Sequence, residues 1–166
     1  MTEVAAYKQW LASGISNREV VETFDIHHPQ WGQIGIVNAD RGITATLEDG
    51  SQRSFMAGRF YWEPPETTDT TYQSTTIALS ALEGRIYEMV KGLSFVDRQT
   101  PISATYRLFF FDNPSEPLIN PPPVWYVHGL ECTREAVRAE LSATQLRVQR
   151  IGLYYTAQEF PALVFL

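Results

Sequence analysis

Alternation of apolar and polar positions gives the clearest structural signal in the chain. Between residues 101 and 111, one set of alternate side chains is apolar: Ile102, Ala104, Tyr106, Leu108 and Phe110. This period of two predicts a β-strand with one face toward a core. A shorter alternation over residues 43–47 runs into Asp49-Gly50, and an apolar run resumes at residue 55. Asp-Gly between two such runs predicts a β-hairpin with a type I′ turn and Gly50 at positive φ.

Other short runs rich in β-branched and aromatic residues predict further strands. They cover residues 20–26, 34–37, 59–62, 75–82 and 124–130. Residues 133–141 fit either a helix or a strand. A strand is favoured, because it can form a hairpin with 124–130 without adding another layer to the fold. Glu22 shares a face with Phe24 and Ile26. The strand at 20–26 is therefore expected at a sheet edge or with a bulge.

Helical periodicity is limited to short segments. Apolar residues at i, i+3 and i+7 predict a helix over residues 3–12, and the same spacing predicts one over 86–93, ended by Gly92. Residues 144–150 form a third candidate. About eight strands and two or three small helices predict a mostly-β (α+β) fold, a β-sandwich or barrel with an N-terminal helix. No linker divides the chain, so residues 1–166 are expected to form a single domain.

Composition narrows the class of protein. The 166 residues include 13 Lys+Arg and 19 Asp+Glu, a net charge of −6, which argues against a nucleic-acid surface held by phosphate contacts. The longest charge-free stretches, 26–39 and 117–130, contain proline and are too short for a membrane span. The N-terminus lacks a signal-peptide pattern. A single cysteine excludes an internal disulfide. We therefore expect a soluble protein with no membrane or sequence-specific nucleic-acid partner.

Candidate chemistry is sparse. Asp25 and His27 share a strand face, but no spacing brings further metal ligands such as His128 or Cys132 to them. Cys132 lacks a partner that would make it a nucleophile, and no G-x-S-x-G elbow is present. Two of the acidic residues Glu63, Glu66 and Asp69 could serve as the paired carboxylates of a glycosidase. All three lie in a polar loop, however, and are expected to be solvated. The sequence predicts no catalytic residue, no metal and no cofactor.

The aromatic content suggests a different kind of site. Phe, Tyr and Trp make up 21 of the 166 residues, and four tryptophans are difficult to bury fully in a chain of this size. Aromatic side chains are enriched at protein interfaces. The interface candidates are Trp62, Trp125, Tyr154, Tyr155 and Phe160. Six of the seven residues at 160–166 are apolar and not proline, so this segment is expected to be packed.

Four segments together carry a family resemblance: residues 20–29 (VVETFDIHHP), 34–60, 101–111 and 154–163. The chain resembles a family from phage and prophage tail gene clusters, known as domain of unknown function 1833. Ala162 stands where glycine is common in that family. The resemblance implies a virion structural protein of the distal tail (tail tip or baseplate), made in the bacterial host cytoplasm. It brings no catalytic residues.

Such a subunit is expected to form a homo-oligomeric ring that links the tail tube to the hub, with tube, tape-measure and hub proteins as partners. Because the genome would pass through the ring, an acidic lumen is expected, and the lumen candidates are Glu63, Glu66 and Asp69. Two alternatives stay open. One is a tail assembly factor that is absent from the mature virion, and the other is a small cell-wall hydrolase.

Overall fold

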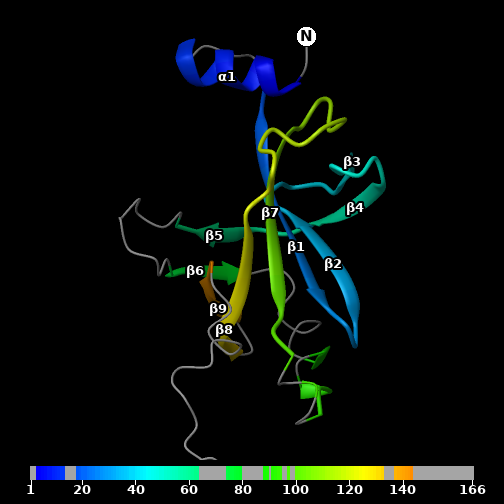
Figure 1. Ribbon diagram of the computed structural model, residues 1–166, viewed down its shortest axis with the longest axis vertical. Helices are drawn as coiled ribbons and strands as arrows, with labels where there is room; N and C mark the ends of the chain where they lie inside the picture. Colours follow the sequence, from blue (N-terminus) through cyan, green and yellow to red (C-terminus); the bar gives the residue numbers. More distant parts are fainter. Residues whose placement is uncertain are drawn as a thin grey trace, which may run out of the picture.

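The computed structural model describes residues 3–13, 18–63, 74–79, 88–89, 91–94, 97, 100–132 and 137–143. The helix and strands of this part are α1 (Glu3–Ser13), β1 (Val20–His28), β2 (Gly32–Val37), β3 (Ile43–Thr46), β4 (Gln52–Ala57), β5 (Phe60–Trp62), β6 (Ser74–Leu79), β7 (Ser103–Phe110), β8 (Val124–Cys132) and β9 (Val137–Ser142). The predicted mostly-β class is confirmed (Figure 1).

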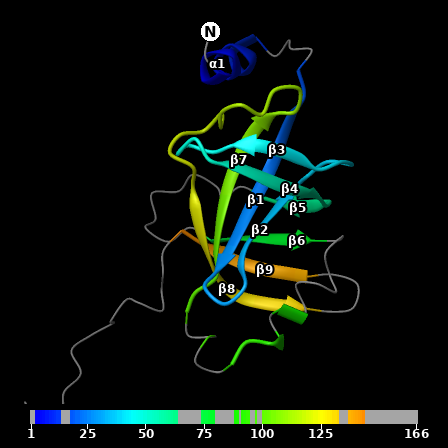
Figure 2. The same ribbon diagram turned by 90° about the vertical axis from the view of Figure 1, so that its right-hand side faces the viewer.

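All nine strands belong to one mixed sheet with the order β3-β4-β2-β1-β7-β8-β9-β6-β5. Neighbours are antiparallel except β2 and β4, which are parallel. β1 and β7 lie at its centre, and Figure 2 shows them crossing the direction of β5, β6 and β9 steeply. Within the described strands, the end strands β3 and β5 do not pair with each other, so the sheet is open.

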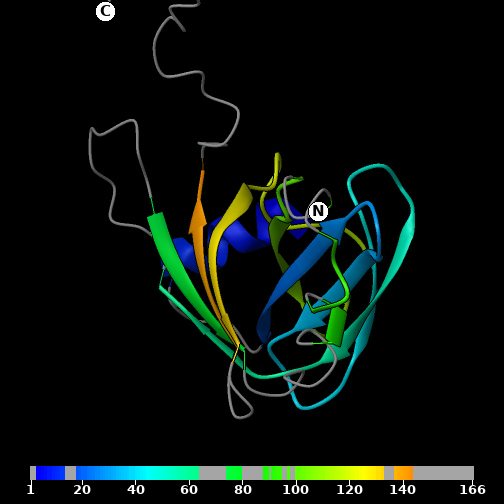
Figure 3. The ribbon, with the colours of Figure 1, turned by 90° about the horizontal axis from the view of Figure 1, so that it is seen from below.

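Strong curvature of the sheet follows from the connection between β4 and β5. Only Gly58 and Arg59 separate these strands, although β4 pairs with β2 and β5 pairs with β6 in the other half of the sheet. So short a link requires the two halves of the sheet to approach each other. Viewed from below, the strands form a curved wall around an interior (Figure 3).

β1 and β7 contain few exposed residues, because each of their two faces packs in a different hydrophobic cluster. One face contributes Phe24 and Tyr106 to the main hydrophobic core inside the curved sheet. The opposite face contributes Val21 and Phe109 to a second cluster, covered by the β3–β4 hairpin. Alternation along β7 therefore divides its side chains between two cores rather than between a core and solvent.

α1 lies across one end of the sheet (Figure 1). Tyr7 packs against the main core, and the Val4 N–H donates to Glu116 Oε1 at 3.2 Å. These contacts explain how an 11-residue helix, too short to be stable alone, is held. In the described residues no helix has both the length and the apolar content that a membrane crossing requires.

Most of the strands expected from the sequence are confirmed. The ambiguous segment at 133–141 is a strand over residues 137–142 and pairs with both β8 and β6. Of the second predicted helix, the structure describes residues 88–89 and 91–94, where the Gly92 N–H donates to the Glu88 carbonyl at 3.0 Å. The candidate helix at 144–150 and the segment 160–166 lie outside the described residues.

Two expectations about local geometry are wrong. β1 is a central strand, paired on both sides, and no bulge occurs at Glu22. The Glu22 carboxylate is tolerated among apolar neighbours because it accepts hydrogen bonds from the Tyr106 hydroxyl at 2.8 Å and the Asn38 amide at 3.2 Å. Hydrogen bonding offsets the cost of placing a carboxylate there.

The second error concerns the hairpin turn. Gly50 has φ of +80°, as predicted, but Asp49 does not have positive φ, so the turn is not type I′. The Gly50 N–H donates to the Leu47 carbonyl at 3.0 Å, and the Leu47 N–H donates to the Ser51 carbonyl at 2.8 Å. This is a type I turn followed by a left-handed glycine, the geometry of a longer hairpin loop.

Candidate functional site

A cluster of four charged side chains, two of them buried, lies between the central strands and the β3–β4 hairpin. Asp25 comes from β1 and Arg107 from β7, and both are less than 10% exposed. Arg107 Nε and Nη2 donate to the two carboxylate oxygens of Glu48 at 2.7 and 3.1 Å. Asp25 Oδ2 lies 3.6 Å from Arg107 Nη1 and 3.9 Å from Arg53 Nε. Glu48 and Arg53 belong to the hairpin, so the cluster ties it to the sheet centre.

The electrostatics of Asp25 are unusual for a paired carboxylate. Burial raises the pKa of Asp25, and this effect outweighs the nearby Arg53 and Arg107 guanidinium groups, which lower it. Among the described residues, Asp25 Oδ1 and Arg107 Nη1 have no hydrogen-bond partner. A raised carboxyl pKa is common at proton-transfer sites. Here, however, the carboxyl lies beneath the hairpin beside two guanidinium groups, which suits a structural ion-pair network.

A second polar network lies between β1 and β7, on the main-core face. The Tyr106 hydroxyl donates to Glu22, and its pKa is raised by burial first and by the Glu22 carboxylate second. The Tyr106 ring also packs beside Phe24 and Trp62, with centroid separations of 5.2 and 5.0 Å. The network therefore anchors an aromatic cluster rather than presenting a free acid.

His28 ends β1 and is 1% exposed. Its Nδ1 accepts a hydrogen bond from the Gln30 N–H at 3.2 Å, so Nε2 carries the proton and donates to the Asp97 carbonyl at 3.2 Å. His27, its neighbour, is exposed, whereas Asp25 is buried. In the part of the chain that the structure describes, no three His, Cys, Asp or Glu side chains are grouped to hold a metal ion.

Comparison with known families gives one match. The model of domain of unknown function 1833 (DUF1833) matches residues 6–151. The chain belongs to the DUF1833 family. This span includes all nine described strands of the sheet and three of the four segments that carry the resemblance, whereas residues 154–163 lie beyond it. No curated protein matches the chain.

Two interface candidates of this DUF1833 chain lie in its interior. Trp125 is 5% exposed, and Trp62 is partly buried against it, with their rings 5.6 Å apart in an edge-on arrangement. Both rings pack into the main core of the folded chain, and a role for them at an interface stays a prediction. The other three candidates, Tyr154, Tyr155 and Phe160, lie outside the described residues.

Exposed large apolar side chains occur elsewhere. Among the residues that the structure describes they are Leu11, Tyr61 and Val124, which are 60%, 65% and 41% exposed. Tyr61 projects from β5, between the inward-facing Phe60 and Trp62, and its hydroxyl donates to Glu63. That hydrogen bond raises the pKa of Tyr61. The strand alternation contained the signal for Tyr61, because its two neighbours are the residues that face the core.

The acidic loop of the sequence analysis is described only at its start. Glu63 is exposed, directly after β5, and is held by the Tyr61 hydroxyl. Glu66 and Asp69 lie outside the described residues. The structure therefore brings together an exposed aromatic ring and one acidic side chain at an end strand of the DUF1833 sheet.

Proposed function

We propose that this DUF1833 chain is a structural subunit of a phage distal tail, at the tail tip or baseplate. The single-domain subunit, of β-sandwich or barrel type, self-assembles into a ring that links the tail tube to the hub. Its partners are further copies of itself and the tube, tape-measure and hub proteins. It works in the virion tail after synthesis in the host cytoplasm, and it needs no cofactor.

The exposed Tyr61 on β5 is the observation that carries this proposal beyond family resemblance. β5 is an end strand of the described sheet, and end strands offer backbone groups to another chain, although the Phe60 N–H already donates to Asn38 Oδ1 at 3.4 Å. Tyr61 is 65% exposed there and places a large aromatic surface beside the strand. Aromatic side chains of this kind are typical of interface cores. Assembly through β5 therefore fits both the backbone and the side chain.

The paired carboxylates also support a structural role over a hydrolase. A hydrolase needs polar groups that converge on a pocket accessible to substrate. The carboxylates of Asp25 and Glu48 instead lie beside guanidinium groups, and Glu22 is hydrogen-bonded to Tyr106 and Asn38. These side chains connect strands to one another.

An acidic lumen is part of the same proposal. Glu63 is exposed beside Tyr61, so an interface at β5 brings Glu63 to the boundary between subunits. Carboxylates on a channel wall repel DNA phosphates over a distance of about 10 Å at moderate salt. Glu66 and Asp69 extend the same acidic loop in the sequence.

Mass spectrometry of purified phage particles tests the role most directly. We expect the chain in the particle at a fixed copy number and a ring at the tail tip in electron micrographs. Absence of the chain from particles that need it for assembly would identify an assembly factor instead. Cell-wall cleavage by the purified chain would identify a hydrolase. Either result overturns the proposal.

A pair of variants tests the surface. Tyr61→Asp places a charge on the proposed interface, and we expect it to abolish oligomers in sedimentation experiments and tail formation in complementation. Leu11→Asp is the matched control, because Leu11 is similarly exposed but lies on α1. Equal loss in both variants, or oligomers retained by Tyr61→Asp, argues against β5 as the interface.

A further inference from the structure

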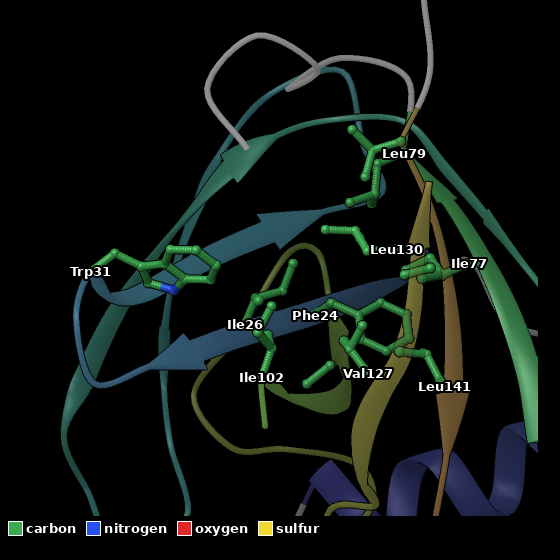
Figure 4. Close-up of a pocket in the computed structure, with 12 residues that line it drawn as sticks. Phe24, Ile26, Trp31, Ile77, Leu79, Ile102, Val127, Leu130 and Leu141 are labelled. Carbon is green, nitrogen blue, oxygen red and sulfur yellow. The ribbon is translucent and has the colours of Figure 1, made fainter. Parts of the chain in front are cut away.

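The two faces of β1 border interiors of different chemistry. On the main-core face, Phe24 and Ile26 line an apolar cavity of about 40 Å³ (Figure 4). Every described residue that lines this cavity is apolar or aromatic. A buried water molecule needs roughly two to four polar partners, so water is not stabilised there. Asp25 lies between these two residues on the strand and belongs to the cluster of four charged side chains beneath the β3–β4 hairpin.

Three polar atoms of this charged cluster are buried without a hydrogen-bond partner among the described residues. They are Asp25 Oδ1, Arg107 Nη1 and Arg53 Nε. The side chains of Asp25 and Arg107 are only 6% and 9% exposed. Leaving a buried polar group unpaired is costly, and the large majority of such groups in folded proteins have a partner. The three atoms therefore indicate that a ligand binds within the cluster.

The spacing of the charged cluster matches a single bridging molecule. Asp25 Oδ2 lies 3.6 Å from Arg107 Nη1 and 3.9 Å from Arg53 Nε, which is too long for a direct hydrogen bond. The unpartnered Oδ1 belongs to the same carboxyl group, so the three atoms lie near one another. Polar atoms at such separations can each lie about 2.8 Å from one water oxygen placed beside the line that joins them.

The donors and acceptors identify this molecule as water rather than an ion. Arg107 Nη1 and Arg53 Nε carry protons to donate, whereas the Asp25 carboxylate accepts hydrogen bonds. Water both accepts and donates, so one molecule satisfies the two guanidinium groups and the carboxylate together. The carboxylate would repel an anion, and the guanidinium groups would repel a cation. The cluster also needs no counter-ion, because Asp25 and Glu48 already balance Arg53 and Arg107 in charge.

We propose that one water molecule is an integral part of the charged cluster, accepting hydrogen bonds from Arg107 and Arg53 and donating one to Asp25 Oδ1. Its three ligands come from β1, β7 and β4, so the water joins the hairpin to the centre of the sheet. The side chains of Arg53 and Glu48 are 26% and 22% exposed, so exchange with bulk water passes on their side. The inference is independent of the tail role, because it concerns the interior of one subunit.

A high-resolution crystal structure, from crystals soaked in rubidium bromide, tests both the site and its occupant. We expect a water oxygen within hydrogen-bond distance of Asp25, Arg107 and Arg53, with no anomalous scattering from rubidium or bromide at that position. Anomalous scattering there would identify an ion site. A direct Asp25–Arg107 hydrogen bond with no density between the cluster's side chains would show that nothing bridges them. Either of these two results overturns the proposal.

Relaxation dispersion of water ¹⁷O in solution provides a second measurement, because it detects internal water molecules that exchange slowly. Arg53→Met removes the ligand on the more exposed side and leaves Asp25 and Arg107 in place. We therefore expect the residence time of one internal water molecule to shorten at least threefold. Arg59→Met is the matched control and should leave the dispersion unchanged, because Arg59 pairs with Asp40 at the surface. Circular dichroism verifies that both variants are folded. Unchanged dispersion in folded Arg53→Met contradicts the proposed site.

Discussion

Replacing Arg107 by methionine should destabilise the protein strongly. Methionine replaces the aliphatic part of the arginine side chain but removes the guanidinium group that bridges Glu48 and Asp25. The two lost partners respond differently. The Glu48 side chain is 22% exposed and regains water, whereas Asp25 is 6% exposed and keeps only Arg53 at 3.9 Å. The loss of stability therefore comes mainly from the buried Asp25 carboxylate, which no longer has a close positive partner.

Removing one partner of a buried ion pair typically costs about 3–5 kcal/mol. If the free energy of unfolding falls by about 2 kcal/mol per molar urea, the unfolding midpoint should fall by about 1.5–2.5 M. Urea unfolding followed by tryptophan fluorescence measures this shift. Arg59→Met is the control, because the Arg59–Asp40 pair is 76% and 84% exposed, and its midpoint should not change measurably.

A double variant identifies the cause. If the stranded Asp25 charge dominates, Asp25→Asn in the Arg107→Met background should recover at least ~1 kcal/mol, since the neutral amide carries no unpaired charge. A single-variant loss below about 1 kcal/mol, or no recovery in the double variant, would refute this account of the cluster.

Three further predictions concern single positions. Gly50→Val should cost about 1–2 kcal/mol in thermal unfolding, because φ is +80° and nothing crowds the site, so the penalty is conformational; Gly50→Asn should cost clearly less, and equal stability of the valine variant would contradict the turn. Gly35→Ala should cost about 1–3 kcal/mol by overpacking, since its methyl group would lie 2.8 Å from Phe55 Cδ1, and a neutral result would show that Phe55 moves easily. Burial raises the pKa of Asp25 in the folded chain, so the folded state binds the proton more readily than the unfolded state. The stability gained by protonating Asp25 is therefore fully present below the unfolded pKa and is lost as pH rises through the folded pKa. Urea midpoints between pH 7 and pH 4 should therefore rise for the natural chain relative to Asp25→Asn as pH falls, and parallel curves would contradict the raised pKa.

Local sequence patterns were sufficient to predict the strands but not all of their environments. The alternation around Tyr106 and Leu108 located β7 because one face of that strand packs in the main core. The other face, with Arg107, also became buried because the hairpin covers it. The sequence near Arg107 does not predict that the hairpin will bury this face. The same limitation explains Glu22, whose stabilising partner Tyr106 lies 84 residues away.

The hairpin shows how a correct location can come with an incorrect geometry. Asp-Gly placed the turn correctly, but the Asp49 carboxylate accepts hydrogen bonds from the Ser51 N–H at 2.9 Å and from its hydroxyl at 2.6 Å. These bonds hold Asp49 outside the left-handed region and favour the longer loop. The exposure of the aromatic residues could not be predicted for a different reason. Composition shows that many aromatic residues are present, but only the sheet shows that Trp125 faces inward and Tyr61 outward.

The central pairing of β1 with β7 has a consequence for how the chain is made. Val20 pairs with Phe110, 90 residues later. At a translation rate of 5–20 residues per second, β1 waits about 5–18 s for its partner to be synthesised. During that interval the side chains on both of its faces lack their final cover, and closing so long a loop slows folding further. Synthesis in the cell should therefore depend on chaperones that shield nascent β1, and slowing translation before residue 100 should increase aggregation.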